Sequence, residues 1–173
     1  LENLSEWCRN LNIKYLTVYA FSLENFSRDE KELDPLMDLF EESFLNAADD
    51  LQVHKNKVRI RSIGHRELLP ERVIKAIDYA EDKTKDYDDY NYNLAVAYGG
   101  RQEIVRSMTR IAEKIKAGEL DSKDIDVDLI SDNLYTSNLP DPDLILRTSG
   151  EERVSNFLLW QLAYSELYFA DVF

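Results

Sequence analysis

The stretch that decides the fold is a short apolar run that ends in two glycines and leads into an amphipathic segment. It reads Leu94-Ala95-Val96-Ala97-Tyr98-Gly99-Gly100-Arg101. Apolar residues occupy consecutive positions from 94 to 98, which is typical of a strand buried on both faces. Beyond the glycines, apolar residues recur at helical spacing from Ile104 to Ile115. A buried strand that passes directly into a helix indicates an α/β fold with a mostly parallel central sheet flanked by helices.

Segments on both sides of this stretch repeat the same pattern. Strands are expected at residues 14–21, 58–63 and 144–147, where short β-branched or apolar runs are bounded by turn residues. Helices are expected at residues 36–51, 70–80 and 126–135. A further apolar helix is expected to start near Asn156 and to carry Glu166 near its end. We therefore expect four strands alternating with helices, in a single partial domain over residues 1–173.

The charge balance and the cysteine count limit the classes of function. The chain of 173 residues carries a formal net charge of -13, which argues against nucleic-acid binding because that needs a basic surface. A few arginines could still build a local anion site. Cys8 is the only cysteine, which excludes an internal disulfide and is typical of a reducing, cytoplasmic location. No apolar run reaches the length of about 18 residues that suggests a membrane span.

Polar residues collect where the four expected strands end. The segments concerned are residues 22–28, 64–66, 98–101 and 147–155. In open parallel sheets, ligands bind outside the carboxyl ends of the strands. We therefore expect the four segments to contribute to one site.

Two arginines in the last of these segments suit a phosphate group. The guanidinium forks of Arg147 and Arg153 match phosphate oxygens in a bidentate manner. Ser155 is expected to cap the helix near Asn156, where the helix amino end adds partial positive charge. The alternative is that these arginines form ordinary surface ion pairs with neighbouring acids such as Glu151.

Three other features are each open to two interpretations. Glu166 could hold a Mg²⁺ ion that bridges phosphate oxygens, or it could be a structural carboxylate. Asn25 could orient a substrate, or it could be a turn residue after a strand. The apolar stripe of residues 36–51 could wall a hydrophobic tunnel, or it could be a core face.

Three spaced motifs of the chain match a known family. The first reads Tyr19-Ala20-Phe21-Ser22-Leu23-Glu24-Asn25-Phe26, the second Tyr98-Gly99-Gly100-Arg101, and the third covers residues 147–161 and 163–169. Together they resemble cis-prenyltransferases, and most closely the bacterial type of undecaprenyl diphosphate synthase. The first motif is similar to the Ser-x-Glu-Asn motif of that family. The similarity covers essentially the whole chain in the same order.

The resemblance implies a reaction, a cofactor and a site. The family condenses isopentenyl diphosphate with an allylic diphosphate, such as farnesyl diphosphate, into a Z-polyprenyl diphosphate, with undecaprenyl diphosphate as the expected product. Asn25 is implied as the catalytic residue, in proton loss, and Glu166 as a ligand of the Mg²⁺ cofactor. The implied substrate-binding residues are Ser22, Leu23, Glu24, Phe26, Arg28, Arg147, Arg153, Val154 and Ser155. Arg147, Arg153 and Ser155 would hold the diphosphate of isopentenyl diphosphate. Ala20, Phe40 and Phe44 would line a product tunnel. The resemblance also implies a homodimer and, through the lipid product, peripheral contact with a membrane.

The chain departs from the family pattern at its ends and in one loop. The Asp-Gly-Asn-Gly-Arg segment of the family would precede residue 1, and its Arg-x-Gly tail would follow residue 173. We therefore expect a fragment that is inactive by itself, cut from an active enzyme. His65 stands where the family usually has Asp, and Ala97 replaces a frequent Asn with little expected effect. Two alternatives stay open, namely a non-catalytic partner subunit of a heteromeric prenyltransferase and a phosphate-binding α/β module.

Overall fold

The computed structural model of the chain describes residues 2–172, and the chain divides into two compact units, Leu1–Ala97 and Tyr98–Phe173. The first unit contains α1 (Glu2–Asn10), β1 (Tyr15–Ser22), η1 (Leu23–Ser27), α2 (Glu30–Asp49), α3 (Leu51–Lys55), β2 (Val58–Ile63), η2 (Arg66–Leu68), α4 (Glu71–Thr84) and β3 (Tyr90–Tyr98). The second contains α5 (Gly100–Lys116), η3 (Ser122–Asp124), α6 (Val127–Asp132), β4 (Leu144–Arg147), η4 (Gln161–Tyr164) and β5 (Glu166–Phe169). None of the helices within residues 2–172 is long and apolar enough to cross a bilayer.

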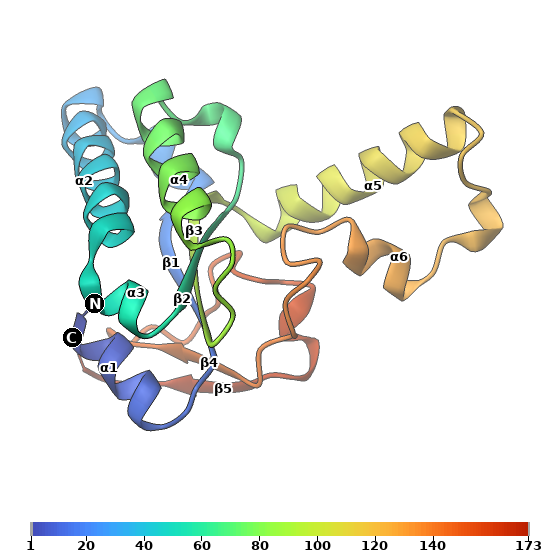
Figure 1. The fold of residues 1–173 in the computed structure, drawn as a ribbon. Coiled ribbons are helices and arrows are strands. Elements are labelled where there is room, and N and C mark those ends of the chain that lie inside the picture. Colours follow the sequence, from blue (N-terminus) through green and yellow to red (C-terminus); the bar gives the residue numbers. More distant parts are fainter. Residues whose placement is uncertain (1, 173) are drawn as a thin grey trace. The chain divides into compact units, whose positions relative to one another are not determined.

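The first unit is a sheet with two long helices packed against it. The strand order is β1-β3-β2, and β2 runs parallel to β3 from the pair Val58 and Tyr90 to the pair Ile63 and Ala95. Helices α2 and α4 lie side by side (Figure 1). The buried residues of α4 include Val73, Ala76, Ile77 and Ala80. Their spacing of three and four places them on one helical face, which explains why α4 can bury a continuous apolar stripe.

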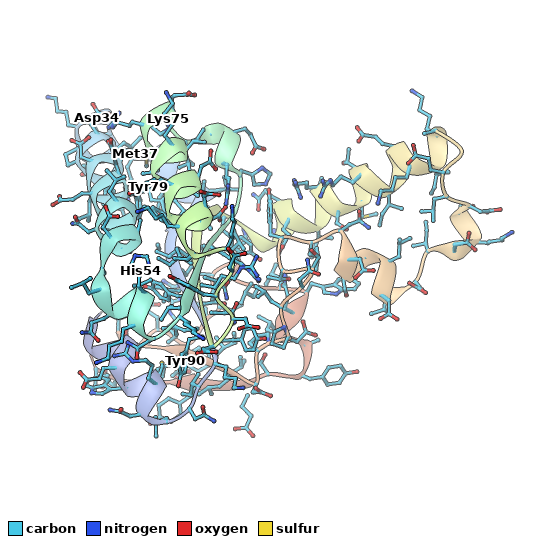
Figure 2. The ribbon with its side chains drawn as sticks, viewed as in Figure 1. Asp34, Met37, His54, Lys75, Tyr79 and Tyr90 are labelled. Carbon is cyan, nitrogen blue, oxygen red and sulfur yellow. The ribbon has the colours of Figure 1, made fainter. Side chains whose placement is uncertain are left out.

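The core of the first unit joins those two helices to the sheet. It contains Phe21 of β1, Phe40 and Phe44 of α2, and Ile60 of β2, together with the apolar face of α4. The rings of Phe21 and Phe40 meet edge to face, with centroids 5.8 Å apart. Tyr79 lies on α4 (Figure 2), and its hydroxyl donates to Asp49 Oδ1 of α2 at 3.0 Å. Phe40 and Phe44 are therefore core residues, and the tunnel role implied for them stays a prediction.

The second unit places a parallel pair of strands beside helical segments and a buried polar network. Strands β4 and β5 pair in parallel, from Leu144 opposite Glu166 to Arg147 opposite Phe169. The fully buried Glu103 accepts hydrogen bonds from the Tyr98 hydroxyl at 2.5 Å, the Tyr135 N–H at 2.8 Å and Gln161 Nε2 at 3.1 Å. Each donor stabilises a carboxylate that is otherwise costly to bury.

The expected fold class is confirmed, because parallel strands are flanked by helices in an α/β arrangement. Most expected elements are present, including the strand at Leu144–Arg147 and the helix near residue 130. The structure has five strands rather than four within residues 2–172, in sheets of three and two strands. The expectation of a single partial domain stays a prediction.

The helix expected from Asn156 to the region of Glu166 is wrong. That stretch consists of turns with only the short 3-10 helix η4, and Glu166 begins strand β5. Ser155, Asn156 and Leu158 have positive φ angles of 47°, 64° and 45°, which an α-helix cannot contain. The apolar residues of this stretch are therefore buried by a compact loop and not by a helix face.

The expectation that Ala97 changes little stays a prediction, on which the backbone conformation at this position bears. Ala97 has a φ of 51° and is fully buried at the end of β3. Asn adopts this left-handed conformation more readily than Ala. The Ala residue therefore carries a backbone cost that the more frequent Asn would reduce.

Candidate active site

The loop after β1 is closed by hydrogen bonds between near neighbours. The Ser22 N–H donates to Asn25 Oδ1 at 2.9 Å, and the Arg28 N–H donates to the Asn25 carbonyl at 3.1 Å. The Ser27 hydroxyl donates to the Glu24 carbonyl at 2.8 Å. Because the Asn25 oxygen is held by Ser22, the side chain amide of Asn25 has a fixed orientation. Its turn function is therefore real, and it also leaves a positioned amide nitrogen for a ligand.

The other residues of this loop divide between core and solvent. Leu23 and Phe26 pack against the apolar core, and the Phe26 ring meets that of Phe21 edge to face at 4.9 Å. Glu24 and Arg28 are exposed, and Arg28 lies 4.0 Å from Glu32. Two inward anchors thus hold a loop whose charged side chains face outward.

The phenol of Tyr19, on β1, has an unusual environment. Burial and, as a smaller cause, the negative charge of Glu24 together raise its pKa to about 12, although a hydrogen bond with Ser22 acts in the opposite direction. Both partners belong to the Asn25 loop. A neutral phenol therefore supports this loop throughout the physiological pH range.

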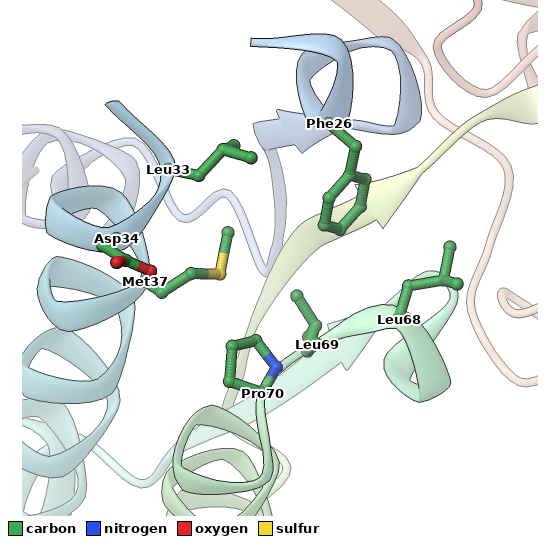
Figure 3. A pocket seen from close by; sticks show the side chains of 7 residues that line it. All are labelled: Phe26, Leu33, Asp34, Met37, Leu68, Leu69 and Pro70. Carbon is green, nitrogen blue, oxygen red and sulfur yellow. The ribbon is translucent and has the colours of Figure 1, made fainter. Parts of the chain in front are cut away.

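A pocket opens beside the same loop (Figure 3). Its cavity volume is about 390 Å³, and six of its seven lining residues are apolar. The lining residues are Phe26, Leu33, Asp34, Met37, Leu68, Leu69 and Pro70. Phe26 directly follows Asn25 in the sequence, but Asn25 itself is not one of the lining residues. Ala20 of the expected tunnel is exposed and is not one of these residues.

The end of β2 is held by backbone contacts with β3. The His65 N–H donates to the Ala97 carbonyl at 2.9 Å, and a Cβ at Gly64 would lie only 2.0 Å from the Val96 carbonyl oxygen. Arg66 forms ion pairs with Glu81 and with Asp78, and its Nη1 lies 3.2 Å from Asp78 Oδ1. Only glycine fits at position 64. Arg66 therefore ties η2 to α4.

In the second unit, the Arg147 side chain folds over the segment that follows it. Its Nη1 donates to the Arg153 carbonyl at 2.5 Å and to Ser155 Oγ at 2.6 Å. The structure therefore brings together Arg147, Arg153 and Ser155, three residues singled out from the sequence. Val154 lies between the last two and is half-buried.

The side chain of Arg153 has a different partner. It forms an ion pair with Glu151, and 65% of the Arg153 side chain is exposed. This is the surface pairing that the sequence left open as an alternative. An exposed pair is weak, so the Arg153 guanidinium can exchange this partner at little cost.

The turn after β4 is tied to the segment that follows β5. The Ser149 N–H donates to the Val172 carbonyl at 2.7 Å, and the Gly150 N–H donates to the Ala170 carbonyl at 3.2 Å. Gly150 has a φ of 68°, and a Cβ there would lie 3.0 Å from Asp171 Oδ1. The turn is thus fixed by residues about 20 positions away.

Glu166 lies at the other end of this small sheet from Arg147. It pairs with Leu144, whereas Arg147 pairs with Phe169, so three register positions, or about 10 Å of strand, separate the two levels. Glu166 is exposed, and its N–H donates to the Asp143 carbonyl at 2.9 Å. Within residues 2–172, no three His, Cys, Asp or Glu side chains gather in a group that could hold a metal.

Asn156 is the residue of this region that the sequence did not single out. Its carbonyl accepts the Gly100 N–H at 2.7 Å, and its Oδ1 accepts the Arg101 N–H at 2.8 Å. Its Nδ2 donates to Gln102 Oε1 at 3.0 Å. Its position directly after Ser155, in a chain with a distant Gly-Gly pair, was the only available signal.

A model of the family described as "Putative undecaprenyl diphosphate synthase" matches residues 1–173. A protein of Methanocaldococcus jannaschii is 56% identical over 169 residues, which are 96% of this chain and 60% of the relative. A protein of Thermococcus kodakarensis is 50% identical over 173 residues, which are 100% of this chain and 66% of the relative. Both are named tritrans,polycis-undecaprenyl-diphosphate synthase (geranylgeranyl-diphosphate specific). The chain thus spans less than two thirds of the length of either relative.

Two solved structures share the fold. A probable undecaprenyl diphosphate synthase from Campylobacter jejuni is 37% identical with a TM-score of 0.86, and the match covers 99% of this chain and 79% of that one. Lavandulyl diphosphate synthase from Lavandula x intermedia, solved with dimethylallyl diphosphate, is 38% identical with a TM-score of 0.85. That match covers 92% of this chain and 69% of the other.

Proposed function

This chain belongs to the undecaprenyl diphosphate synthase family of cis-prenyltransferases, and we propose that the whole protein condenses isopentenyl diphosphate with an allylic diphosphate. The observation that carries the proposal is the 56% identity with a protein named for this kind of synthesis. The expected product is a Z-polyprenyl diphosphate, with undecaprenyl diphosphate as the specific proposal. The names of the relatives favour geranylgeranyl diphosphate over farnesyl diphosphate as the primer.

In the proposed reaction, Arg147, Arg153 and Ser155 bind the diphosphate of isopentenyl diphosphate. The Ser155 hydroxyl accepts a hydrogen bond from Arg147, so its own proton is available for a phosphate oxygen. Arg153 would exchange Glu151 for the ligand. Charged hydrogen bonds of this type also stabilise a diphosphate as its charge develops.

Asn25 is proposed to act at the reacting carbons. When the allylic carbon bonds to isopentenyl diphosphate, the allylic diphosphate leaves and one proton must be lost to form the new double bond. The bond from the Ser22 N–H fixes the Asn25 amide, and a fixed amide could orient the group that takes the proton. The pocket beside Phe26, most of whose lining residues are apolar, is proposed to hold the hydrocarbon part of a substrate.

Mg²⁺ is the proposed cofactor, with Glu166 as one ligand. Mg²⁺ is usually held by one or two carboxylates plus substrate phosphates and waters, so an exposed single carboxylate fits such a role. When bound, the ion would stabilise the departing diphosphate by its charge.

We also propose a homodimer and a cytoplasmic, membrane-peripheral location. Helix α5 exposes 62% of Val105 and 60% of Met108, and apolar surface of this kind favours association. Sedimentation velocity of the protein at its full natural length should give twice the monomer mass. A monomer at micromolar concentration would contradict the dimer.

Activity is the direct test. The protein at its full natural length should convert isopentenyl diphosphate, Mg²⁺ and either geranylgeranyl or farnesyl diphosphate into longer prenyl diphosphates, detected by mass spectrometry. Comparison of the two primers tests the primer proposal separately. If no longer product forms with either primer, the catalytic proposal fails and the alternative of a non-catalytic partner subunit gains support.

A further inference from the structure

The loop that carries Arg153 and Ser155 has an unfavourable backbone. Ser155, Asn156 and Leu158 all lie in the left-handed region, where the Cβ of each residue crowds the following carbonyl oxygen. Three such residues within four positions persist only where other contacts hold them.

The contacts come from the amino end of α5. Gly99, which precedes α5, provides no side-chain cap, so the first N–H groups of the helix need other acceptors. Asn156 supplies two, its carbonyl for Gly100 and its Oδ1 for Arg101. Asn156 therefore caps a helix that begins 56 positions earlier in the chain.

The two glycines leave the space that this contact needs. A Cβ at Gly99 would lie 2.8 Å from Asn156 Nδ2 and 2.5 Å from Gln102 Oε1. A Cβ at Gly100 would lie 3.0 Å from the Leu159 nitrogen and 3.1 Å from the Asn156 carbonyl oxygen. Neither glycine has a φ that excludes other residues, so close approach accounts for both of them.

The same segment continues directly into the anion-binding groups. Ser155 precedes Asn156, and its hydroxyl is held by Arg147 at 2.6 Å. A shift of Asn156 would therefore move Ser155 and change the contact with Arg147. Sub-ångström positioning of such groups decides how well an anion is bound.

We infer that Asn156, seated on Gly99 and Gly100, is a positioning residue that holds Ser155 and Arg147 in the geometry that binds a diphosphate. This inference rests on the proposed function, because it assigns the ligand to the same site. Asn156 acts through Ser155 and Arg147 and does not itself contact the substrate.

Three substitutions in the protein at its full natural length separate the parts of this contact. Asn156→Ala removes both side-chain bonds and adds a left-handed Ala, so affinity for isopentenyl diphosphate should fall about tenfold or more. Asn156→Asp keeps the acceptor for Arg101 at a helix amino end, where a negative charge is favourable, but it loses the donor to Gln102 and adds negative charge next to Ser155, so the loss of affinity should be smaller than in Asn156→Ala but still measurable. Gln102→Leu removes only the bond from Asn156 Nδ2 and should give a smaller loss of affinity. Because Gln102 is exposed, the substitution should not prevent folding.

Calorimetric titration with isopentenyl diphosphate and with inorganic pyrophosphate gives the affinity, and steady-state kinetics give KM and kcat. Asn156→Ala should raise KM for isopentenyl diphosphate while kcat is retained. Asn133→Ala is the matched control, because this buried Asn bonds to Leu129 and Lys114 within the same unit. It should lower thermal stability without changing either affinity.

A double-mutant cycle distinguishes the possible failures. If Asn156 acts through Ser155, the effects of Asn156→Ala and Ser155→Ala should not add. Fully additive effects, or an unchanged affinity in Asn156→Ala, would overturn the inference about Asn156. If Ser155→Ala still lowered the affinity in that case, the proposed diphosphate site would stand. If neither ligand binds the unsubstituted protein, or if Ser155→Ala and Arg147→Ala change nothing, the proposed function itself fails and the inference fails with it.

Discussion

Two loops that follow strands are held in opposite ways. The Asn25 loop is closed by hydrogen bonds between residues three positions apart, and Phe26 anchors it to the core of its own unit. The segment from Arg147 to Asn156 depends on distant partners, namely Gly100 and Val172. Proposed chemistry resides in the first loop and proposed diphosphate binding in the second. A locally closed loop keeps its shape when other parts change, whereas a segment held from afar transmits changes into binding.

The largest expected effect is on the turnover number, from the Asn25 loop. Asn25→Ala should lower kcat by about 100-fold, a typical contribution of a group that assists proton transfer, with little change in KM for isopentenyl diphosphate. Ser27→Ala is the matched control, because it removes a neighbouring local hydrogen bond without touching Asn25. Equal losses in both variants would mean that the loop's shape, and not the Asn25 amide, matters.

The next largest effect should be a rise in KM, caused by a substitution in the segment from Arg147 to Asn156. Arg147→Ala removes charge-assisted bonds worth about 1.5–3 kcal/mol each, so KM for isopentenyl diphosphate should rise about tenfold or more. Arg110→Ala removes the same charge from an exposed position of α5 and should leave KM unchanged. If Arg147→Ala instead lowers kcat alone, the proposal that the Asn25 loop serves the chemical step and the Arg147 segment serves binding is wrong.

A pair of glycines tests whether the distant segment is held from afar. Gly150 and Gly118 both have positive φ angles, of 68° and 76°. A Cβ added at Gly150 would lie 3.0 Å from Asp171 Oδ1, whereas one added at Gly118 would meet none of the described residues within 4 Å. Gly→Ala should cost about 1 kcal/mol of unfolding free energy at either site, measured by urea denaturation. Gly150→Ala should also raise KM severalfold, and Gly118→Ala should not. Equal KM values in the two variants would mean that the turn at Gly150 does not influence binding of isopentenyl diphosphate.

The contrast between the loops also explains what the sequence could predict. Helices α2, α4 and α5 follow from apolar spacing within about 20 residues, and β2 and β3 from short apolar runs. The local turn around Asn25 was likewise recognisable, because Asn after a strand favours turns. These features depend on neighbours in the chain, which a sequence displays directly.

The stretch after Ser155 could not be predicted in the same way. Its residues have helical apolar spacing, but Asn156 and Leu158 adopt left-handed conformations because the contact with Gly99 and Gly100 holds them there. A helix would satisfy the local pattern and lose those bonds. The pairing of Glu166 with Leu144, which separates it from Arg147, was hidden for the same reason.

The smallest expected effect concerns the proton on Tyr19. Burial and Glu24 raise the pKa of the phenol from its ordinary value of 10.0 to about 12, so the folded state holds this proton more tightly than the unfolded chain. The resulting stability is complete below pH 10 and is lost as the pH rises from about 10 to about 12. Glu24→Gln should lower the pKa of Tyr19 and leave it above the ordinary value, because burial is the larger cause.

The pKa of Tyr19 can be measured from the ultraviolet absorbance of tyrosinate, as the difference between each protein and its Tyr19→Phe counterpart. Glu32→Gln, which removes a carboxylate that faces Arg28, should leave the pKa of Tyr19 unchanged. If both Glu variants shift it equally, the effect is one of net charge, and the Asn25 loop is less self-contained than its hydrogen bonds indicate.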